Sequence, residues 1–345
     1  MSPRSCPPAP RPSGTRAPPA PPLPARGRVR GGAPWIAIGL LLLVAGAVAF
    51  ALAFRYAARA QTPEERAFAR ERADFAPDSI AALGRIDAAL RESSGLAVGS
   101  DGVHLWSHND SGDEARFYAL DRTGARVATF ELEGVEAQDW ESMDAGPCAL
   151  DPSRRCLYLA DTGDNARRRD VLTVHLVPEP DEPRLDARVA ALGRLRFLYP
   201  AGARDAEAVA VSPAGDFVVI SKGRTGDILL FHLEPEALRS AIESDAPVRF
   251  EGGRGLGLVP DWSVGRVVTG AAFRPDGAVL AVRTLSEIHF FDWPALTEAA
   301  PACFLGTLEP QGEAVTWDSD GALLLSSETS WKGPGMLTRV RCAGV

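Results

Sequence analysis

The stretch Glu207-Ala208-Val209-Ala210-Val211 begins a unit that recurs along the chain. A turn containing Gly215 follows it, and the run Phe217-Val218-Val219-Ile220 comes next. Short apolar runs separated by Gly, Pro and Asp turns are typical of antiparallel β-strands. The same order recurs at four further places, whose first runs are Ser94-Gly95-Leu96-Ala97-Val98, Glu141-Ser142-Met143-Asp144-Ala145, Thr269-Gly270-Ala271-Ala272-Phe273 and Glu313-Ala314-Val315-Thr316-Trp317.

A third apolar run follows in each unit, and most units add a fourth, as at 127–132, 194–199 and 248–250. Four-stranded units spaced by 44 to 66 residues predict an all-β fold, the blades of a β-propeller. We count five blades, and six is the alternative if 160–205 or 233–265 contains another. The last unit ends after three runs, so we expect residues 80–86 to supply its fourth strand and close the ring.

The sequence before the repeats divides into three segments by composition. Residues 1–33 are rich in Pro, Ala, Gly and Arg, which predicts a disordered tail. Residues 34–54 include 20 consecutive uncharged residues from Trp35 to Phe54, enough for one transmembrane helix. Residues 55–78 are charged and rich in Ala, which predicts a solvated helical stalk. The propeller then occupies residues 79–345.

The charges around the apolar segment predict its orientation. Arg26, Arg28 and Arg30 precede it, so the tail is expected in the cytoplasm and the propeller outside, with the chain anchored in the cell membrane. A cleaved signal peptide is the alternative, since Ala58-Arg59-Ala60 has the small-x-small form of a cleavage site. Both interpretations export the propeller.

The charge of the chain is unevenly distributed. The net charge is −8, but residues 1–34 carry six Arg and no acidic residue, so the remainder carries −14. An acidic body argues against nucleic acid as a partner, because phosphate binding needs a basic face. The chain contains no Gly-x-Ser-x-Gly, His-Glu-x-x-His or Walker A motif. The sequence therefore gives no motif evidence for a serine hydrolase, a zinc protease or a nucleotide hydrolase.

The repeat is expected to bring polar residues to one end of the ring. First and second strands run antiparallel, so the start of one and the end of the other lie together. The units start at Ser94, Glu141, Glu207, Thr269 and Glu313, and the second strands end at His108-Asn109-Asp110, Asp161, Ser221-Lys222, Arg283-Thr284 and Ser327-Glu328. We predict an acidic mouth there, where the ligand-binding residues are Ser94, His108, Asn109, Lys222, Thr269, Arg283 and Glu328.

Carboxylates of this mouth are candidate ligands for Ca²⁺, which takes six to eight oxygens. The candidates are Asp110, Asp139, Glu141, Asp161, Asp164, Glu207, Glu313 and Glu328, and of these we predict Asp110, Glu141, Asp161, Glu207 and Glu313 as the metal ligands. No Asp-x-Asp-x-Asp-Gly loop is present, so such a site would be assembled across blades. In the alternative, the Asp residues form turns and the Glu residues pair with Lys222, Arg283 and nearby Arg.

Seven stretches between residues 92 and about 330 carry a family resemblance: Glu92-Ser93-Ser94-Gly95-Leu96, Leu105-Trp106-Ser107-His108-Asn109-Asp110-Ser111-Gly112, Asp139-Trp140-Glu141, Asp161-Thr162-Gly163-Asp164-Asn165, Asp205-Ala206-Glu207-Ala208, Thr269-Gly270-Ala271 and Gln311-Gly312-Glu313-Ala314. Together they resemble a family of secreted or membrane-anchored bacterial β-propeller proteins, which is similar at a distance to phytase-like, quinoprotein-like and WD40-like propellers. The phytase-like comparison implies calcium on the mouth carboxylates and phosphate on Lys222 and Arg283. It does not fix an activity, since one fold hosts many functions.

Three functions follow as hypotheses. The first is a module whose mouth binds a small molecule with the help of Ca²⁺. The second is a phytase-like, metal-dependent phosphoesterase. The third is a scaffold that binds envelope proteins through its rims and has no catalytic role.

Four cysteines lie in the exported part. Cys148 and Cys156 flank the Asp151-Pro152 turn of one hairpin, which leaves Cys303 and Cys342 for each other. An even number of cysteines in an exported domain predicts two disulfides. Four buried thiols are the alternative.

Overall fold

The structure is a computed structural model that describes residues 75–345 except 225 and 307. The predicted tail and transmembrane segment lie outside the described residues. Of the predicted stalk only residues 75–78 are described, and they contain no α-helix. Within the described part of the chain, no helix is long and apolar enough to cross a membrane.

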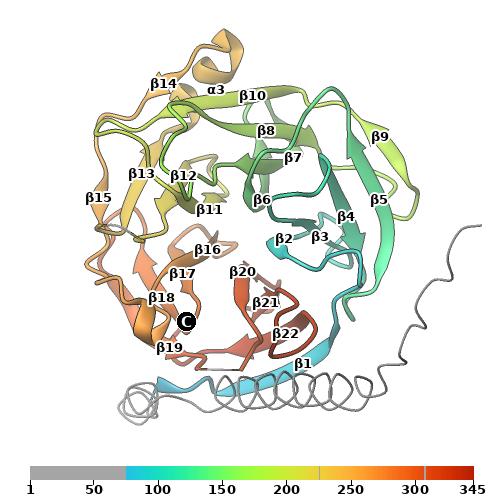
Figure 1. The fold of residues 1–345 in the computed structure, drawn as a ribbon, viewed down its shortest axis with the longest axis vertical. Helices are drawn as coiled ribbons and strands as arrows, with labels where there is room; N and C mark the ends of the chain where they lie inside the picture. Colours follow the sequence, from blue (N-terminus) through green and yellow to red (C-terminus); the bar gives the residue numbers. More distant parts are fainter. Residues whose placement is uncertain (1–74, 225, 307) are drawn as a thin grey trace, which may run out of the picture. The chain divides into compact units, whose positions relative to one another are not determined.

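Five sheets surround one axis (Figure 1), and we number them blades 1 to 5 in chain order. From the axis outward, blade 1 contains β2 (Ser93–Val98), β3 (Leu105–Asn109), β4 (Arg116–Leu120) and β5 (Arg126–Leu132). Blade 2 contains β6 (Trp140–Cys148), β7 (Asp151–Asp161), β8 (Leu172–Pro178) and β10 (Gly193–Leu198). Blade 3 contains β11 (Ala206–Val211), β12 (Phe217–Ser221), β13 (Leu229–Leu233) and β15 (Arg254–Gly255). Blade 4 contains β16 (Val268–Phe273), β17 (Val279–Thr284), β18 (Glu287–Asp292) and β19 (Glu298–Phe304). Blade 5 contains β20 (Gly312–Trp317), β21 (Leu323–Ser327), β22 (Met336–Arg341) and β1 (Ser79–Arg85).

The innermost strands β2, β6, β11, β16 and β20 contact their neighbours around the axis (Figure 1). These strands are the first runs of the sequence repeat, and most of their residues are buried. The prediction of a five-bladed propeller with four-stranded blades is therefore confirmed. The alternative of six blades is wrong for the described residues, because 160–205 and 233–265 extend existing sheets.

The ring is closed by pairing the two ends of the described chain. β1 is antiparallel to β22, with Ser79 opposite Arg341 and Arg85 opposite Met336. The expectation that residues 80–86 complete the last blade is confirmed. Closure of this kind removes a sheet edge that would otherwise expose unpaired backbone groups.

One predicted fourth strand is wrong. Residues 248–250 were expected to complete blade 3, but β14 (Val248–Arg249) pairs in parallel with β10 at the edge of blade 2. The cause is α3 (Pro235–Ser244), which follows β13 and buries Leu238 and Ile242 in the core beside blade 2. The helix brings the chain to blade 2 before β15 returns to complete blade 3.

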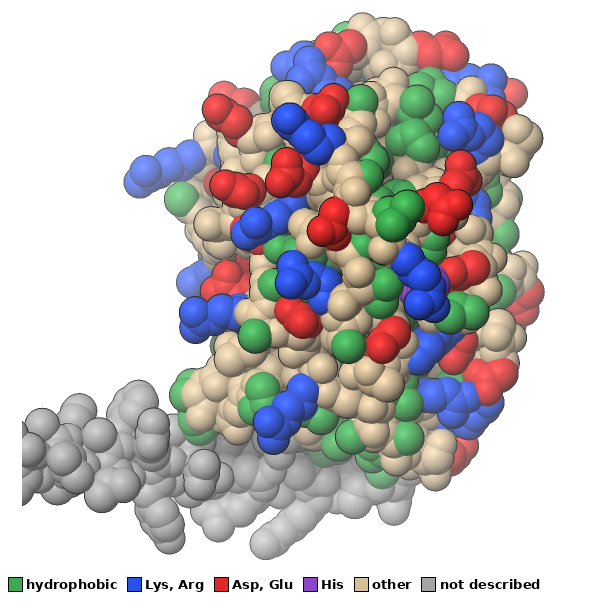
Figure 2. All heavy atoms as spheres, turned by 90° about the vertical axis from the view of Figure 1, so that its right-hand side faces the viewer, with side chains coloured by type: hydrophobic (Ala, Val, Ile, Leu, Met, Phe, Trp, Pro, Cys, Tyr) green, Lys and Arg blue, Asp and Glu red, His purple; other side chains and the backbone are tan. Residues whose placement is uncertain are grey.

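Two further features bear on compartment and surface. Both predicted disulfides are present: Cys148 pairs with Cys156, and Cys303 pairs with Cys342. Figure 2 shows the outer wall on the side of β5 and β9 (Ala187–Val189), where basic and acidic side chains are interspersed without a large patch of one sign.

Candidate functional site

Each innermost strand has a β-bulge at the first residue of its repeat. The pairing register shifts around Ser94, Glu141, Glu207, Thr269 and Glu313. A bulge leaves its extra residue outside the regular ladder and redirects its side chain, and bulges are common beside functional sites. All five residues are buried, and all five bulges lie at the same end of the channel. We call this end the acidic mouth.

Carboxylates from three consecutive blades meet in the acidic mouth. Asp110, Asp139 and Glu141 place oxygens within 4.8 Å of one another, and Glu141, Asp205 and Glu207 do the same. Asp110 follows β3 of blade 1, Asp139 and Glu141 lie at the start of β6, and Asp205 and Glu207 lie at the start of β11. We call Asp110, Asp139 and Glu141 the outer group, and Glu141, Asp205 and Glu207 the inner group. Glu141 therefore belongs to both.

Lys222 is the cation of the inner group. Its ammonium pairs with Glu207 and lies 4.0 Å from Oδ2 of Asp205. Burial opposes the charged form, but attraction to Glu207 and Glu141 outweighs it and raises the pKa of Lys222. In contrast, none of the outer-group carboxylates forms an ion pair with a described residue.

The carboxyl groups of the mouth retain protons more readily than free carboxyl groups. Burial, together with repulsion from Asp139, raises the pKa of Asp110 to about 6. Burial, with repulsion from Glu207 and Asp110, raises the pKa of Glu141 well above its ordinary value. The pKa of Glu207 is raised by burial to about 8. Part of the mouth is therefore protonated near neutral pH, and a bound cation would compete with these protons.

Two buried oxygens of the mouth, Oδ2 of Asp205 and Oγ1 of Thr269, have no hydrogen-bond partner within the described part of the chain. Asp205 is 7% exposed, and its other oxygen, Oδ1, accepts a hydrogen bond from the backbone N–H of Asp164. Asp205 belongs to the inner group. A buried acceptor without a partner costs about 1–3 kcal/mol, so Oδ2 is well suited to a cation or a donor.

The blade 5 side of the mouth is held by an amide. The Gln311 side chain donates to Oε1 of Glu313 at 2.9 Å and to Oε2 of Glu328 at 2.7 Å. Burial raises the pKa of each carboxyl group to about 8, with added repulsion from Glu328 on Glu313 and from Asp110 on Glu328. The structure thus brings these two predicted residues together, and Asp110 of the outer group and Glu207 of the inner group both repel Glu328.

Other predicted residues lie behind the mouth. Asp161 pairs with Arg169 at 2.7 Å and accepts hydrogen bonds from the backbone N–H groups of Gln138 and Asp139, so it supports the outer group without joining it. Arg283 is fully buried, pairs with Glu309 and donates to backbone carbonyls of blade 5.

The remaining predicted residues contact the backbone around β2 and β3. Asn109 accepts a hydrogen bond from the N–H of Glu92 and donates to the carbonyl of Ala89. His108 is buried, with Nδ1 2.8 Å from the carbonyl of Asn109 and its ring edge-to-face with Trp140. The Ser94 hydroxyl donates to the carbonyl of Glu92 at 3.4 Å.

Asp205 is a mouth residue that the sequence-based choice of ligands missed. The pattern that could have found it is a polar residue two positions before the bulge, as in Asp139-Trp140-Glu141 and Asp205-Ala206-Glu207. Gln311 occupies the same position before Glu313. In these three blades the residue two positions before the bulge is polar, whereas Val267, two positions before Thr269, is apolar and buried.

Comparison with known proteins identifies similarity of fold only. No protein-family model matches the chain, and no curated protein sequence matches it significantly. The PQQ-bound aldose sugar dehydrogenase from Streptomyces coelicolor aligns with a TM-score of 0.46 and 12% identity over 77% of this chain and 100% of that chain. A luciferin-regenerating enzyme aligns with a TM-score of 0.44 and 12% identity over 77% of this chain and 96% of its own. Neither similarity bears on the chemistry of the mouth.

Proposed function

We propose that this chain is a membrane-anchored, extracytoplasmic binding module that holds Ca²⁺ on the outer group of its acidic mouth. The proposal rests on one observation. Asp110, Asp139 and Glu141, supplied by two blades, converge within 4.8 Å of one another without an ion pair to any described residue. Uncompensated carboxylates at this separation repel one another, and a cation removes that repulsion.

The donor set suits calcium. Every candidate ligand atom of the outer group is a carboxylate oxygen, which hard cations such as Ca²⁺ prefer. Asp110 and Asp139 are partly exposed, so ions can reach them from solvent. Three carboxylates supply at most six oxygens, and Ca²⁺ takes up to eight. Oxygen atoms of a small-molecule ligand can complete the shell, which is how the metal would assist binding.

Lys222 restricts the metal to the outer group. Its ammonium already neutralises Glu207 in the inner group, so a second divalent cation there would meet a positive charge. The inner group then acts as a fixed support for Glu141, which both groups share.

The two disulfides support an oxidising compartment, and the uncharged run from Trp35 to Phe54 supports the anchor. The resemblance to secreted and membrane-anchored bacterial propellers agrees with this location.

The phytase-like alternative is less well supported, because it needs Lys222 and Arg283 to hold phosphate. These two residues are instead paired with Glu207 and Glu309.

Thermal unfolding of the purified full chain in detergent, with and without Ca²⁺, tests the proposal. Binding to the native state raises the midpoint, and Ca²⁺ at a hundred times its Kd contributes about 2.7 kcal/mol. Asp110→Asn and Glu141→Gln should abolish the rise, whereas Glu182→Gln, an exposed carboxylate outside the mouth, should retain it.

A midpoint that does not respond to millimolar Ca²⁺ would overturn the proposal, as would an equal rise in Asp110→Asn. Mg²⁺ serves as the matched ion and should raise the midpoint less, because it demands a tighter octahedral shell. Calcium-dependent release of phosphate from p-nitrophenyl phosphate would favour the phosphoesterase instead.

A further inference from the structure

A cavity of about 550 Å³ lies at the opposite end of the central channel from the acidic mouth. Its lining includes Val98, Val211, Phe273 and Trp317, which are the last residues of β2, β11, β16 and β20. Cavities of this size accommodate small organic molecules, and they are typically apolar with a few polar groups. The cavity shares no lining residue with the inner or outer group.

The walls of the cavity are mixed, with slightly more apolar than polar surface. Phe273 and Trp317 lie on adjacent innermost strands, and Pro147, Pro213 and Pro275 follow or interrupt the strands nearby. Proline and aromatic rings present rigid surfaces, so a ligand that contacts them loses little binding energy to side-chain ordering.

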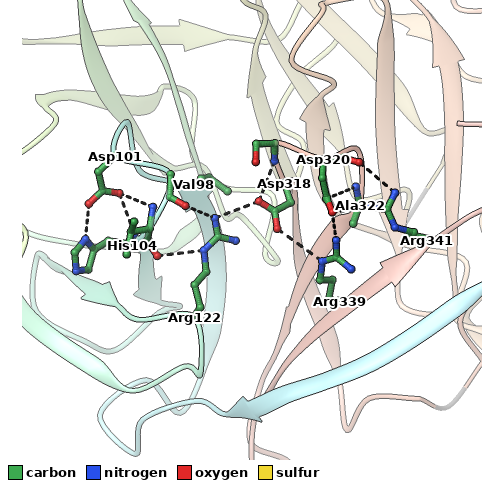
Figure 3. Close-up of polar contacts among 12 residues, drawn as sticks. Val98, Asp101, His104, Arg122, Asp318, Asp320, Ala322, Arg339 and Arg341 are labelled. Atoms are coloured by element: carbon green, nitrogen blue, oxygen red, sulfur yellow. Dashed lines mark hydrogen bonds and ion pairs between the residues drawn. The ribbon is translucent and has the colours of Figure 1, made fainter.

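The acidic side chains around the opening are already paired. Ser319 lines the cavity, and its neighbours Asp318 and Asp320 face arginines (Figure 3). Asp318 accepts a hydrogen bond from Arg122 at 3.2 Å, and Asp320 pairs with Arg341 at 2.6 Å and also with Arg339. These carboxylates therefore contribute little net negative charge to the opening.

Three other acidic side chains nearby either face a basic side chain or accept hydrogen bonds from neighbouring residues. Asp101 contacts the His104 ring (Figure 3), with 2.5 Å between Oδ2 and Nδ1, and Glu179 pairs with Arg155 at 3.0 Å. Asp151 accepts hydrogen bonds from the backbone N–H and hydroxyl of Ser153.

Asp144 is the acid that lines the cavity itself. Its oxygens accept hydrogen bonds from the N–H groups of Ala145 at 2.8 Å and Val211 at 2.7 Å. Burial outweighs these hydrogen bonds and raises the pKa of Asp144 to about 7. Below that pH the carboxyl is mostly neutral and does not repel an anion.

Arg154 remains as the available charge. It lines the cavity, is exposed, and forms no hydrogen bond or ion pair with any residue in the described part of the chain. We propose that this cavity is a second binding site, for a small apolar carboxylate whose body contacts Phe273 and Trp317 and whose acid group pairs with Arg154. A guanidinium pairs with a carboxylate through two parallel hydrogen bonds, which gives the site its selectivity for anions.

Calorimetric titration with 2-naphthoate tests this inference, with the neutral 2-naphthamide as the probe of the same shape. The full chain is titrated at pH 6 in detergent, and heats for detergent alone are subtracted. We expect 2-naphthoate to bind with a Kd at least tenfold lower than that of 2-naphthamide. Arg154→Glu should remove this difference, and Ser319→Trp should fill the opening and weaken both probes.

Arg168→Glu is the charge-matched control, because Arg168 is exposed in the loop after β7 at the acidic-mouth end. It should leave both affinities unchanged. Both substituted residues are exposed, so folding should be preserved and is checked by the unfolding midpoint. Equal affinities for the two probes, or an unchanged 2-naphthoate affinity in Arg154→Glu or Ser319→Trp, would overturn the inference. Neither result would affect the calcium proposal, which concerns the other end of the channel.

Discussion

The Lys222 ammonium pairs with the Glu207 carboxylate inside the acidic mouth, with 15% of the lysine side chain and 4% of the glutamate side chain exposed. Glu207 is the bulge residue of β11, and Lys222 follows β12 of the same blade. The pair therefore neutralises the inner group of carboxylates from within blade 3. The outer group, which belongs to blades 1 and 2, has no such cation among residues 75–345 that the structure describes.

Lys222→Met should destabilise the protein, because it leaves Glu207 buried without its partner. Breaking a buried ion pair by removing one member typically costs about 3–5 kcal/mol. Chemical denaturation at pH 9 without Ca²⁺, above the pKa of about 8 of Glu207, measures the loss. The double variant Lys222→Met with Glu207→Gln should recover much of it, since no unpaired charge remains. A double variant as unstable as the single one would contradict this account of the pair.

Lys222→Met should also increase the response to Ca²⁺. Without the ammonium, the carboxylates of the inner group become available to the metal, so the rise in unfolding midpoint at a given Ca²⁺ concentration should exceed that of the wild type. Titration of both proteins with Ca²⁺ in parallel measures the difference. A smaller rise would show that Lys222 supports metal binding instead of competing with it.

Arg283 and Glu309 form a second buried ion pair, behind the mouth, with side chains 0% and 3% exposed. Arg283 also donates to the carbonyls of Ala314 and Ser326, which joins blade 4 to blade 5. Arg283→Met should lower the free energy of unfolding by about 3–5 kcal/mol. The calcium-induced shift in midpoint should persist, because Arg283 does not contact the outer group. Loss of that shift in a folded Arg283→Met protein would place Arg283 in the binding site after all.

The sequence predicts the propeller because the repeat is local. Each unit specifies its own strands and turns, and the polar residue that begins it marks the bulge at Glu141, Glu207 and Glu313. Partner choice across blades is not encoded in this way. The pairing of Arg283 with Glu309 depends on a loop whose path follows from tertiary packing.

The strand misassigned to blade 3 has a similar cause. Val248 lies in a short run whose sequence pattern predicts an outer strand but does not say which blade that strand joins. The amphipathic face of α3, which buries Leu238 and Ile242, decides that it joins β10. Local pattern therefore fixes that a segment is a strand, while a contact made elsewhere fixes its sheet.

Asp144 should make stability depend on pH. The folded protein keeps the Asp144 proton up to a pKa of about 7, whereas an unfolded chain loses it near pH 4. Between these values the folded state binds more protons, so the free energy of unfolding falls as pH rises. Asp144→Asn should reduce this fall by on the order of 2 kcal/mol between pH 5 and 7.5, measured by denaturation at several pH values. An identical pH slope in both proteins would mean that Asp144 is ionised throughout.

The two disulfides should differ in their contribution to stability. Cys148 and Cys156 are 8 residues apart within the β6–β7 hairpin, whereas Cys303 and Cys342 are 39 residues apart and link β19 of blade 4 to the chain after β22 of blade 5. The entropy that a cross-link removes from the unfolded chain grows with loop length, to roughly 2.5 kcal/mol for the shorter loop and roughly 4 kcal/mol for the longer.

Replacing Cys303 and Cys342 together by Ser should therefore lower the free energy of unfolding more than replacing Cys148 and Cys156. The longer link also joins the last two blades beside the closure by β1, so its loss should expose that edge preferentially. Denaturation of the two double variants gives the order, and hydrogen exchange at β1 and β22 gives the location. Faster exchange of both strands is expected only when Cys303 and Cys342 are replaced. A larger loss from the hairpin pair would mean that strain or packing at the hairpin, and not loop closure, sets the contribution of these bonds.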